Sequence, residues 1–594
     1  MKFNPFKMND LFAKLSVVSV VHRLRHPWSS RRLSALLCLS ALSFFFPLFR
    51  GTDTLVCAAQ TQPPKQVPSY RIAGKIVDAS TNLPLPGAEL SFTEASAEMK
   101  ITSDEQGRFL FAGLDPGKYT LMASAPGYVT ESYNQRSHYS TAIVVGPALD
   151  SEHLLVRLHR QAVITGTVTD EHGEPVRDAQ VLLFIQERAG KRLVSVTPTN
   201  DLGAYRFASL QAGNYFVAVS ARPWYAQAAF RGGLPSSTST FNDGAVVHSY
   251  SRPRQSVDPR LDVVYPITFF PGLSDEHSAG ELILTPGDTQ EADVRLQAVP
   301  SLHIRVTNLP SSQPYGVGEN FAATRKVFDS FDFGVSMSVV RISSDVLEIS
   351  GLPPGEISLN FNSTQNGGTE SRTIPVNVNE GESIDASGTA SAASVSGKIL
   401  AADGAAHLQG SVTLAGRDGR SFDKTMEKDG SFSFPHVEPG TYEVQVNLGG
   451  EDYVRELTAA GAKVAGQDVK IDGSEEVRLL VRMGRGFGQV KGVVQADGKP
   501  YPGAMVLLIP TFGESLEKYS RMDQSDSDGS FALERILPGK YLLMAIDDWD
   551  LDWQDSAALA PYRAKAQSLT VAPSETKTTQ IQLLTASVAV KSTR

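Results

Sequence analysis

Cysteine is almost absent from this 594-residue chain, and its only two cysteines, Cys38 and Cys57, lie within the first 58 residues. The rest of the chain has no thiol, which excludes internal disulfides, thiolate metal clusters and a cysteine nucleophile from it. Long hydrophobic runs are equally scarce. After residue 58 no stretch is long and apolar enough to span a bilayer as a helix.

Basic residues are outnumbered by acidic ones, 55 to 64, which gives a net charge of −9. The first 58 residues hold eight Lys/Arg and two Asp, so the remainder carries a net charge of −15. Such an acidic body is not attracted to nucleic acid or to anionic lipid, which excludes nucleic acid as a partner. The 41% hydrophobic and 20% charged residues are typical of folded domains rather than disorder.

Residues 1–58 are predicted to be a signal peptide or an anchor. Arginines at positions 23, 25, 31 and 32 precede an apolar run from Leu33 to Phe49, and small residues follow. Cleavage after Ala58 or Ala59 fits a signal peptide, which the shortness of the run favours over a retained anchor. Residues 59–69 form a Pro-rich linker. We therefore expect an exported protein that is periplasmic, at the cell surface or secreted.

Glycines recur at a fixed spacing through the rest of the chain. Four triplets share a second interval of 10 residues and a first interval of 33 or 37: Gly74, Gly107 and Gly117; Gly166, Gly203 and Gly213; Gly397, Gly430 and Gly440; Gly492, Gly529 and Gly539. Spacing this regular indicates one structural unit repeated along the chain.

The sequences that surround these glycines predict β-hairpins. Aromatic residues alternate with polar ones after the second glycine, as in Phe109 and Phe111, which is the period of a half-buried strand. A turn at the third glycine reverses the chain, and a strand that begins with tyrosine returns: Tyr119, Tyr215, Tyr442 and Tyr541. Short strands with turn signals every 8 to 12 residues are typical of a β-sandwich.

A fifth, diverged copy is predicted within residues 300–387. Leu352-Pro353-Pro354-Gly355 repeats the turn, whereas Asp345 replaces the upstream glycine and Ile357 replaces the tyrosine. The predicted organisation is listed as modules 70–159, 160–299 with a long insertion at 221–265, 300–387, 393–484 and 486–586.

The combined pattern G-x-V-x-D, P-x-x-G-A, D-x-x-G-x-F-x-F and L-x-P-G-x-Y resembles the carboxypeptidase regulatory-like domain. The resemblance implies an all-β chain, a tandem array of about five seven-stranded Greek-key sandwiches of the transthyretin-like type, grouped by shape with carbohydrate-binding-like folds. It specifies a fold and says little about function, because this sandwich is an accessory module in many exported proteins.

The sequence offers no catalytic constellation. None of the eleven histidines is followed by glutamate three residues later, and the nearest pair is His436 and Glu438. G-x-S-x-G, H-E-x-x-H and phosphate-loop motifs are also missing. The acidic turns at Asp104 and Asp526 resemble part of a calcium loop but lack the downstream glutamate, which favours plain turns. We expect a protein without catalytic residues, metal or cofactor.

Aromatic residues follow the returning strands at similar offsets and form the candidate binding residues: Trp224, Tyr225, Trp549, Trp553 and Tyr562. On exposed loops, flat aromatic rings stack on sugars; alternatively, each ring packs under its own loop or against the next module.

The insertion from Ala221 to Tyr265 adds arginines to an otherwise acidic body, where they either meet an anionic ligand or are solvated.

Three hypotheses remain. The first is a non-catalytic interaction or scaffold array, whose partner is an envelope protein. The second is a carbohydrate-binding protein that uses the loop aromatics of modules 2 and 5 to hold a polysaccharide. The third is an enzyme accessory with a cryptic site. A transmembrane barrel is disfavoured because the chain lacks a long series of lipid-facing strands. The repeats and the missing motifs favour the scaffold array.

Overall fold

The computed structural model describes residues 69–585. Short gaps lie at 95–96, 189, 227–236, 241–245, 251–257, 308–319, 344–345, 366–367, 380–382, 386–391, 405–407, 418, 474–475 and 513–515. The predicted signal region 1–58 and most of the linker 59–69 lie outside the described residues. The chain divides into two units, Met1–Val67 and Pro68–Arg594, and the fold below belongs to the second.

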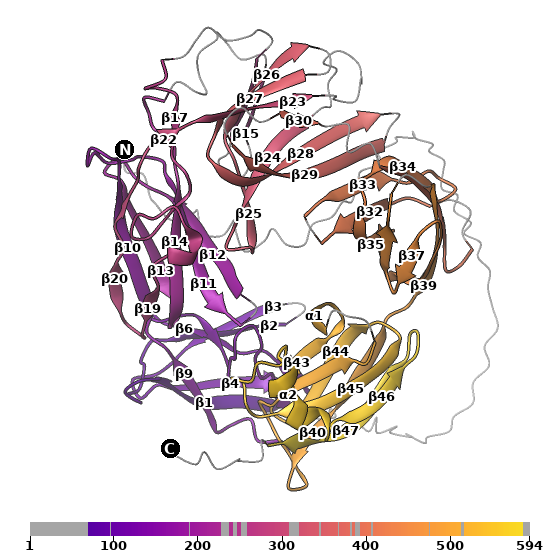
Figure 1. The fold of residues 1–594 in the computed structure, drawn as a ribbon. Helices are drawn as coiled ribbons and strands as arrows, with labels where there is room; N and C mark the ends of the chain where they lie inside the picture. The colour runs from indigo at the N-terminus through magenta and orange to yellow at the C-terminus, as the bar shows by residue number, and fades with distance from the viewer. Residues whose placement is uncertain are drawn as a thin grey trace, which may run out of the picture. The chain divides into compact units, whose positions relative to one another are not determined.

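Strands dominate the described residues, which confirms the predicted all-β class (Figure 1). The two α-helices among them are short, α1 (Leu516–Tyr519) and α2 (Ser556–Arg563). Within these ranges no helix combines the length and the hydropathy that crossing a bilayer requires.

The first sandwich is built around strand β1 (Tyr70–Asp78). It pairs antiparallel with β4 (Arg108–Leu114) and parallel with β9 (Leu154–Leu158). The facing sheet has the order β3-β2-β6-β7, with β2 at Glu89–Glu94, β3 at Ala97–Thr102, β6 at Met122–Ser124 and β7 at Glu131–Ser132. Phe109 and Phe111 point into the core between the sheets and Leu110 is 52% exposed, as their alternation predicts.

The pairing of β1 recurs in four further segments (Figure 1). The central strands are β10 (Ala162–Thr169), β23 (Leu302–Thr307), β31 (Ala393–Leu400) and β40 (Gly488–Ala496). Their antiparallel partners are β13 (Ala204–Leu210), β27 (Val346–Leu352), β34 (Ser431–Val437) and β44 (Ser530–Ile536). Their parallel partners are β20 (Thr289–Glu291), β30 (Ser383–Asp385), β39 (Val477–Arg485) and β47 (Thr576–Leu584).

Each of these segments surrounds a hydrophobic core of its own. The five cores span residues 72–158, 162–296, 304–378, 393–483 and 490–581, and each lies within one predicted module. We call the segments the first to the fifth sandwich. In the third, Ile357 is 3% exposed and occupies the core position that a tyrosine holds in the others, whereas Asp345 lies outside the described residues.

The repeated glycine and tyrosine have local physical causes. A Cβ at Gly492 would lie 2.2 Å from the carbonyl oxygen of Thr579 on the parallel strand, so only glycine allows the two backbones to approach. Gly529 has a φ of +76°, which glycine adopts without strain. Tyr541 is fully buried, and its hydroxyl donates to the carbonyl of Leu537 at 2.7 Å. The buried ring thus keeps its polar group satisfied.

Sheet edges join the third sandwich to its neighbours. Strand β29 (Gly368–Val378) pairs antiparallel with β33 (Ser421–Thr425) of the fourth sandwich, which produces one nine-stranded sheet. Strand β16 (Val246–Tyr250), from the insertion in the second sandwich, pairs parallel with β26 (Met337–Ser343) of the third. Strand addition therefore covers edges that would otherwise expose unpaired backbone groups.

Candidate functional site

The described residues hold one group of side chains with the spacing of a metal site, Asp170, Glu171 and His172. Asp170 accepts the backbone N–H groups of His172 and Glu174 at 2.8 and 2.9 Å, as in an ordinary acidic turn. Glu171 accepts the hydroxyls of Tyr225 and Tyr265. Both carboxylates are therefore engaged in holding the loop.

The same two tyrosines remain protonated at neutral pH. Burial and the bond to Glu171 raise the pKa of Tyr225 to about 12. Burial, again with Glu171, raises the pKa of Tyr265 as well. They serve as hydrogen-bond donors and do not provide a general base.

In the nearest histidine–glutamate pair of the sequence, His436 and Glu438, the side chain that the structure describes is that of Glu438. Glu438 is 8% exposed and lies 3.9 Å from the guanidinium of Arg420, so it is not the exposed hairpin residue that its position predicts. At Asp104, one of the two calcium-like turns, the carboxylate accepts the N–H groups of Gln106 and Arg108, as expected of a plain turn.

Two of the five predicted binding aromatics lie in the second sandwich. Trp224 is 89% exposed, and its ring meets the half-buried ring of Tyr225 edge to face at 5.9 Å. Tyr225 is fixed by its bond to Glu171. The indole of Trp224 is therefore exposed to solvent, and the tyrosine beside it is fixed by a hydrogen bond.

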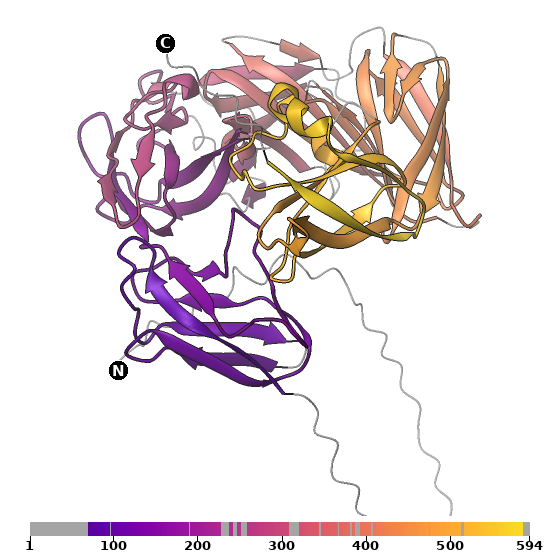
Figure 2. The same ribbon diagram turned by 90° about the horizontal axis from the view of Figure 1, so that it is seen from below.

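The other three predicted aromatics belong to one apolar cluster around α2, to which Tyr562 contributes from the helix itself. Tyr562 is 3% exposed, and both Trp549 and Trp553 pack against the same cluster, which covers the outer face of strand β42 (Met505–Pro510). The indole N–H of Trp549 donates to the carbonyl of Gly503 at 2.9 Å. Figure 2 shows α2, in yellow, beside the sheet of the fifth sandwich. Burial of large rings against an apolar strand accounts for this placement.

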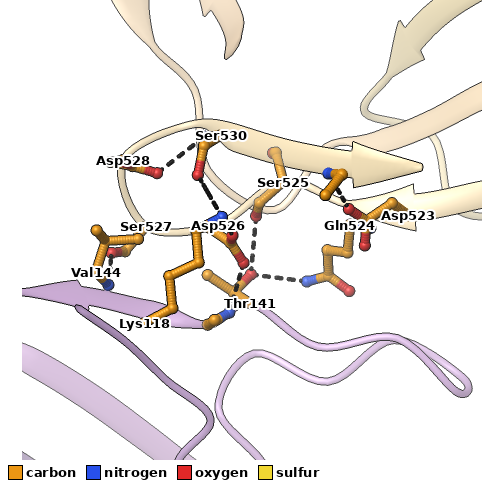
Figure 3. A network of polar contacts seen from close by, with 12 residues as sticks. Lys118, Thr141, Val144, Asp523, Gln524, Ser525, Asp526, Ser527, Asp528 and Ser530 are labelled. Atoms are coloured by element: carbon orange, nitrogen blue, oxygen red, sulfur yellow. Dashed lines mark hydrogen bonds and ion pairs between the residues drawn. The ribbon is translucent and has the colours of Figure 1, made fainter. Parts of the chain in front are cut away.

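The first sandwich docks on the fifth through a polar network that joins residues about 400 positions apart (Figure 3). The N–H of Ser527 donates to the carbonyl of Ala142 at 2.9 Å, and the N–H of Val144 donates to the Ser527 hydroxyl at 2.8 Å. The N–H of Ala142 donates to the Asp526 carboxylate at 3.0 Å. These bonds extend the edge of β8 (Ile143–Val145) with the turn of residues 525–528.

Charged and amide groups complete this interface, which we call the 1–5 junction. The Lys118 ammonium lies 2.5 Å from Asp526 and 2.9 Å from the Ser530 hydroxyl. The Gln524 amide donates to the Thr141 hydroxyl at 2.9 Å, and both residues are 1% exposed. Desolvated polar groups with good partners give such a contact specificity as well as strength.

Trp549 also belongs to the edge of the 1–5 junction. Its ring centroid lies 6.1 Å from that of Tyr139 in the first sandwich. Arg188 of the second sandwich donates to the carbonyls of Trp549 and Leu551. Three sandwiches therefore meet at the loop that the sequence analysis selected for its aromatics.

A second contact joins the second and third sandwiches and is apolar. Phe328, between β24 (Asn320–Val327) and β25 (Phe331–Gly334), packs against Phe184, Phe216 and Phe269, with ring centroids 5.0 to 5.6 Å apart. These three residues lie on the outer face of the sheet formed by β11 (Gln180–Glu187), β14 (Gly213–Ser220) and β18 (Thr268–Phe269).

The sequence analysis missed the layers that cover the outer faces of β11 and β42, although a signal for them exists. The runs VLLF in β11 and MVLLI in β42 are continuously apolar, and every residue in them is buried. A strand buried on both faces requires a second layer over its outer side. Phe328 provides that layer for β11, and α2 provides it for β42. The residues of the 1–5 junction have no comparable local signal.

Comparison with known proteins finds a family match for two segments of the chain. Residues 71–148 and 163–235 match the family model of the carboxypeptidase regulatory-like domain, which confirms the resemblance for these two segments. No curated protein matches the chain.

Several bacterial proteins of known structure, two of them pilins, are similar at low identity. The Bacillus anthracis TIE protein shares 9% identity over 86% of this chain and 68% of its own, with a TM-score of 0.14. A streptococcal ancillary pilin shares 15% over 48% and 98%, with a TM-score of 0.19. BcpA, the major pilin subunit of Bacillus cereus, shares 10% over 71% and 99%, with a TM-score of 0.13. TM-scores this low carry no argument about function.

Proposed function

We propose that the protein is an exported, non-catalytic scaffold whose sandwiches are held against one another to form an interaction platform in the periplasm or at the cell surface. The 1–5 junction carries the proposal. Across it the Ala142 N–H donates to the Asp526 carboxylate, and the Gln524 amide donates to the buried Thr141 hydroxyl. Domains that move independently on linkers need no such contact, whereas a platform in which the domains keep a fixed arrangement does.

Two further observations support a platform. The outer face of the second sandwich is covered by Phe328 of the third, and an edge of the third is covered by β33 of the fourth. The carboxylates of the one metal-like group in the described residues are engaged in loop bonds. Asp170 and Glu171 are thus used to hold their loop.

Export is tested by fractionating cells that express the full chain with a C-terminal tag. We expect the tagged protein outside the cytoplasm, with an N-terminus at Ala59 or Gln60 when the isolated protein is sequenced. A chain that keeps its leader and remains in the cytoplasm contradicts export.

The platform is tested by cross-linking in the same cells. Envelope proteins that are cross-linked to the wild type should no longer be cross-linked to Asp526→Lys, in which the 1–5 junction is disrupted.

A second function, sugar binding, is favoured only at Trp224, because that indole is 89% exposed beside a fixed Tyr225. Replacing Trp224 with alanine should reduce retention on any polysaccharide that the wild type binds, because the substitution removes the large flat surface on which a sugar ring would stack. A glycan array and polysaccharide pull-down measure it. Trp553→Ala is the comparison, because Trp553 packs against the apolar cluster around α2. Equal retention by wild type and Trp224→Ala excludes this site.

A further inference from the structure

A groove of about 1350 Å³ lies between the fourth and fifth sandwiches, and we call it the 4–5 groove. Its described lining includes Tyr453 of the fourth sandwich and Phe512 and Tyr519 of the fifth. Tyr453 lies in β36 (Asp452–Ala460), and Tyr519 is the last residue of α1. Small-molecule sites measure about 300–1,000 Å³, so a groove of this volume suits a segment of an extended chain.

Two of the rings that line the 4–5 groove lie directly against glycines. A Cβ at Gly484 of β39 would lie 2.4 Å from Cζ of Tyr453. A Cβ at Gly539, the first residue of β45 (Gly539–Ile546), would lie 2.3 Å from Cε1 of Phe512. Because no side chain separates ring from strand at these positions, the fold sets the place of each ring before a ligand binds.

The two tyrosines of the groove provide hydrogen-bond donors as well as rings. Within the described part of the chain, neither the Tyr453 nor the Tyr519 hydroxyl has a hydrogen-bond partner. Burial raises the pKa of Tyr453, and burial together with the Asp468 carboxylate raises that of Tyr519. Both hydroxyls therefore keep their proton at neutral pH and can donate it to a ligand.

The three acidic side chains in the described lining each have a basic partner. The pairs are Asp468 with Arg417 at 2.8 Å, Glu456 with Arg482 at 3.5 Å, and Glu443 with Lys518. Three basic residues, Arg417, Arg455 and Lys518, also line the groove, so the formal charges of the described lining cancel. Such a surface is complementary to an uncharged ligand, because an ionic ligand would compete with the existing pairs.

This set of hydrogen-bonding groups favours a ligand that accepts hydrogen bonds and does not donate them. Sugar hydroxyls donate as well as accept, and the carboxylates that would receive their protons are already shared with basic side chains. Proline has no N–H, and a polyproline II helix makes no internal hydrogen bonds, so its carbonyls are free to accept. Segments of this kind dock in grooves that are lined by aromatic residues.

We propose that the 4–5 groove binds a proline-rich segment of a partner protein in the polyproline II conformation. Tyr453, Phe512 and Tyr519 contact its proline rings, and the two tyrosine hydroxyls donate to its carbonyls. The inference goes beyond the scaffold function, because it assigns a partner chemistry to one defined surface of the protein.

Calorimetric titration of the full mature chain tests the site. The probe is decaproline, with a glycine–serine decapeptide and cellohexaose as controls. We expect saturable binding of decaproline alone. Absence of saturable decaproline binding, equal binding of the two peptides, or binding of cellohexaose in place of decaproline overturns the proposal. Because the titration uses purified protein, its outcome is independent of export and of the cross-linking that tests the scaffold.

Variants locate the bound peptide. Tyr453→Phe and Tyr519→Phe keep the ring and remove the donor, so each should weaken decaproline binding about 2- to 10-fold. Tyr453→Ala removes the ring as well and should weaken it by about tenfold or more. Tyr70→Phe is the matched control, since Tyr70 is a partly buried tyrosine of the first sandwich. Wild-type affinity in all three groove variants, or equal weakening in Tyr70→Phe, overturns the assignment.

Discussion

Replacing Asp526 with lysine will separate the first sandwich from the fifth. The substitution sets a second ammonium group against Lys118 and removes the acceptor of the Ala142 N–H. Because the Lys118 side chain is 48% exposed, the ion pair itself contributes about 0–1 kcal/mol. Leaving the Ala142 N–H without its acceptor adds about 1–3 kcal/mol. The turn itself should persist, because the backbone bond from Gly529 to the Asp526 carbonyl does not involve the side chain. Small-angle scattering should record a larger radius of gyration.

The same turn provides a matched control. The Asp528 carboxylate accepts the N–H of Ser530 in its own turn, so Asp528→Lys should leave the radius of gyration at the wild-type value. The double exchange Lys118→Asp with Asp526→Lys restores opposite charges and should recover part of the compaction. An unchanged radius and unchanged protease resistance in Asp526→Lys would show that the 1–5 junction does not hold the two sandwiches together.

Phe328→Ala will uncouple the second and third sandwiches. The Phe328 ring is 9% exposed among Phe184, Phe216 and Phe269, and the Lys191 ammonium lies 4.7 Å from its centroid. Truncation of a buried phenylalanine to alanine costs about 3–5 kcal/mol. Most of this loss falls on the contact between the sandwiches rather than on either separate core, because the Phe328 cluster lies outside both.

Differential scanning calorimetry separates these effects. The second and third sandwiches should unfold together in the wild type and in two transitions in Phe328→Ala. Phe331→Ala is the control, because Phe331 is partly buried at the edge of the same cluster and should cost less. A single transition in Phe328→Ala at the wild-type temperature is incompatible with a role for this ring in coupling the sandwiches.

The sequence was sufficient for everything that depends on local pattern. Alternation at Phe109 and Phe111 identified the core face of β4, and the buried Tyr541 follows from the tyrosine that begins each returning strand. A close approach of two strands explains Gly492. These features depend on residues within one sandwich, where spacing along the chain determines position in space.

What the sequence did not reveal lies between the sandwiches. Lys118 and Asp526 are 408 positions apart, and the residues that flank each of them in sequence are those of an ordinary surface position. Trp549 and Trp553 were predicted as candidate sugar-binding residues, and in the structure they pack against the apolar cluster around α2. Exposed stacking rings and rings packed beside a helix have the same spacing in sequence. Only the fold of the segment 547–566, with α2 at its centre, separates the two outcomes.

Thr141 and Ser525 are 384 residues apart, so the 1–5 junction forms only late in the synthesis of the chain. At about 5–20 residues per second, ribosomes need about 20–80 s to synthesise the intervening chain. During that interval the first sandwich exists without its cover, and the edge at β8 is open to pairing with other strands. A chain that stops before the fifth sandwich never closes this edge. The contact therefore distinguishes a finished polypeptide from a truncated one, and a chaperone or protease that recognises open strand edges can act on that difference.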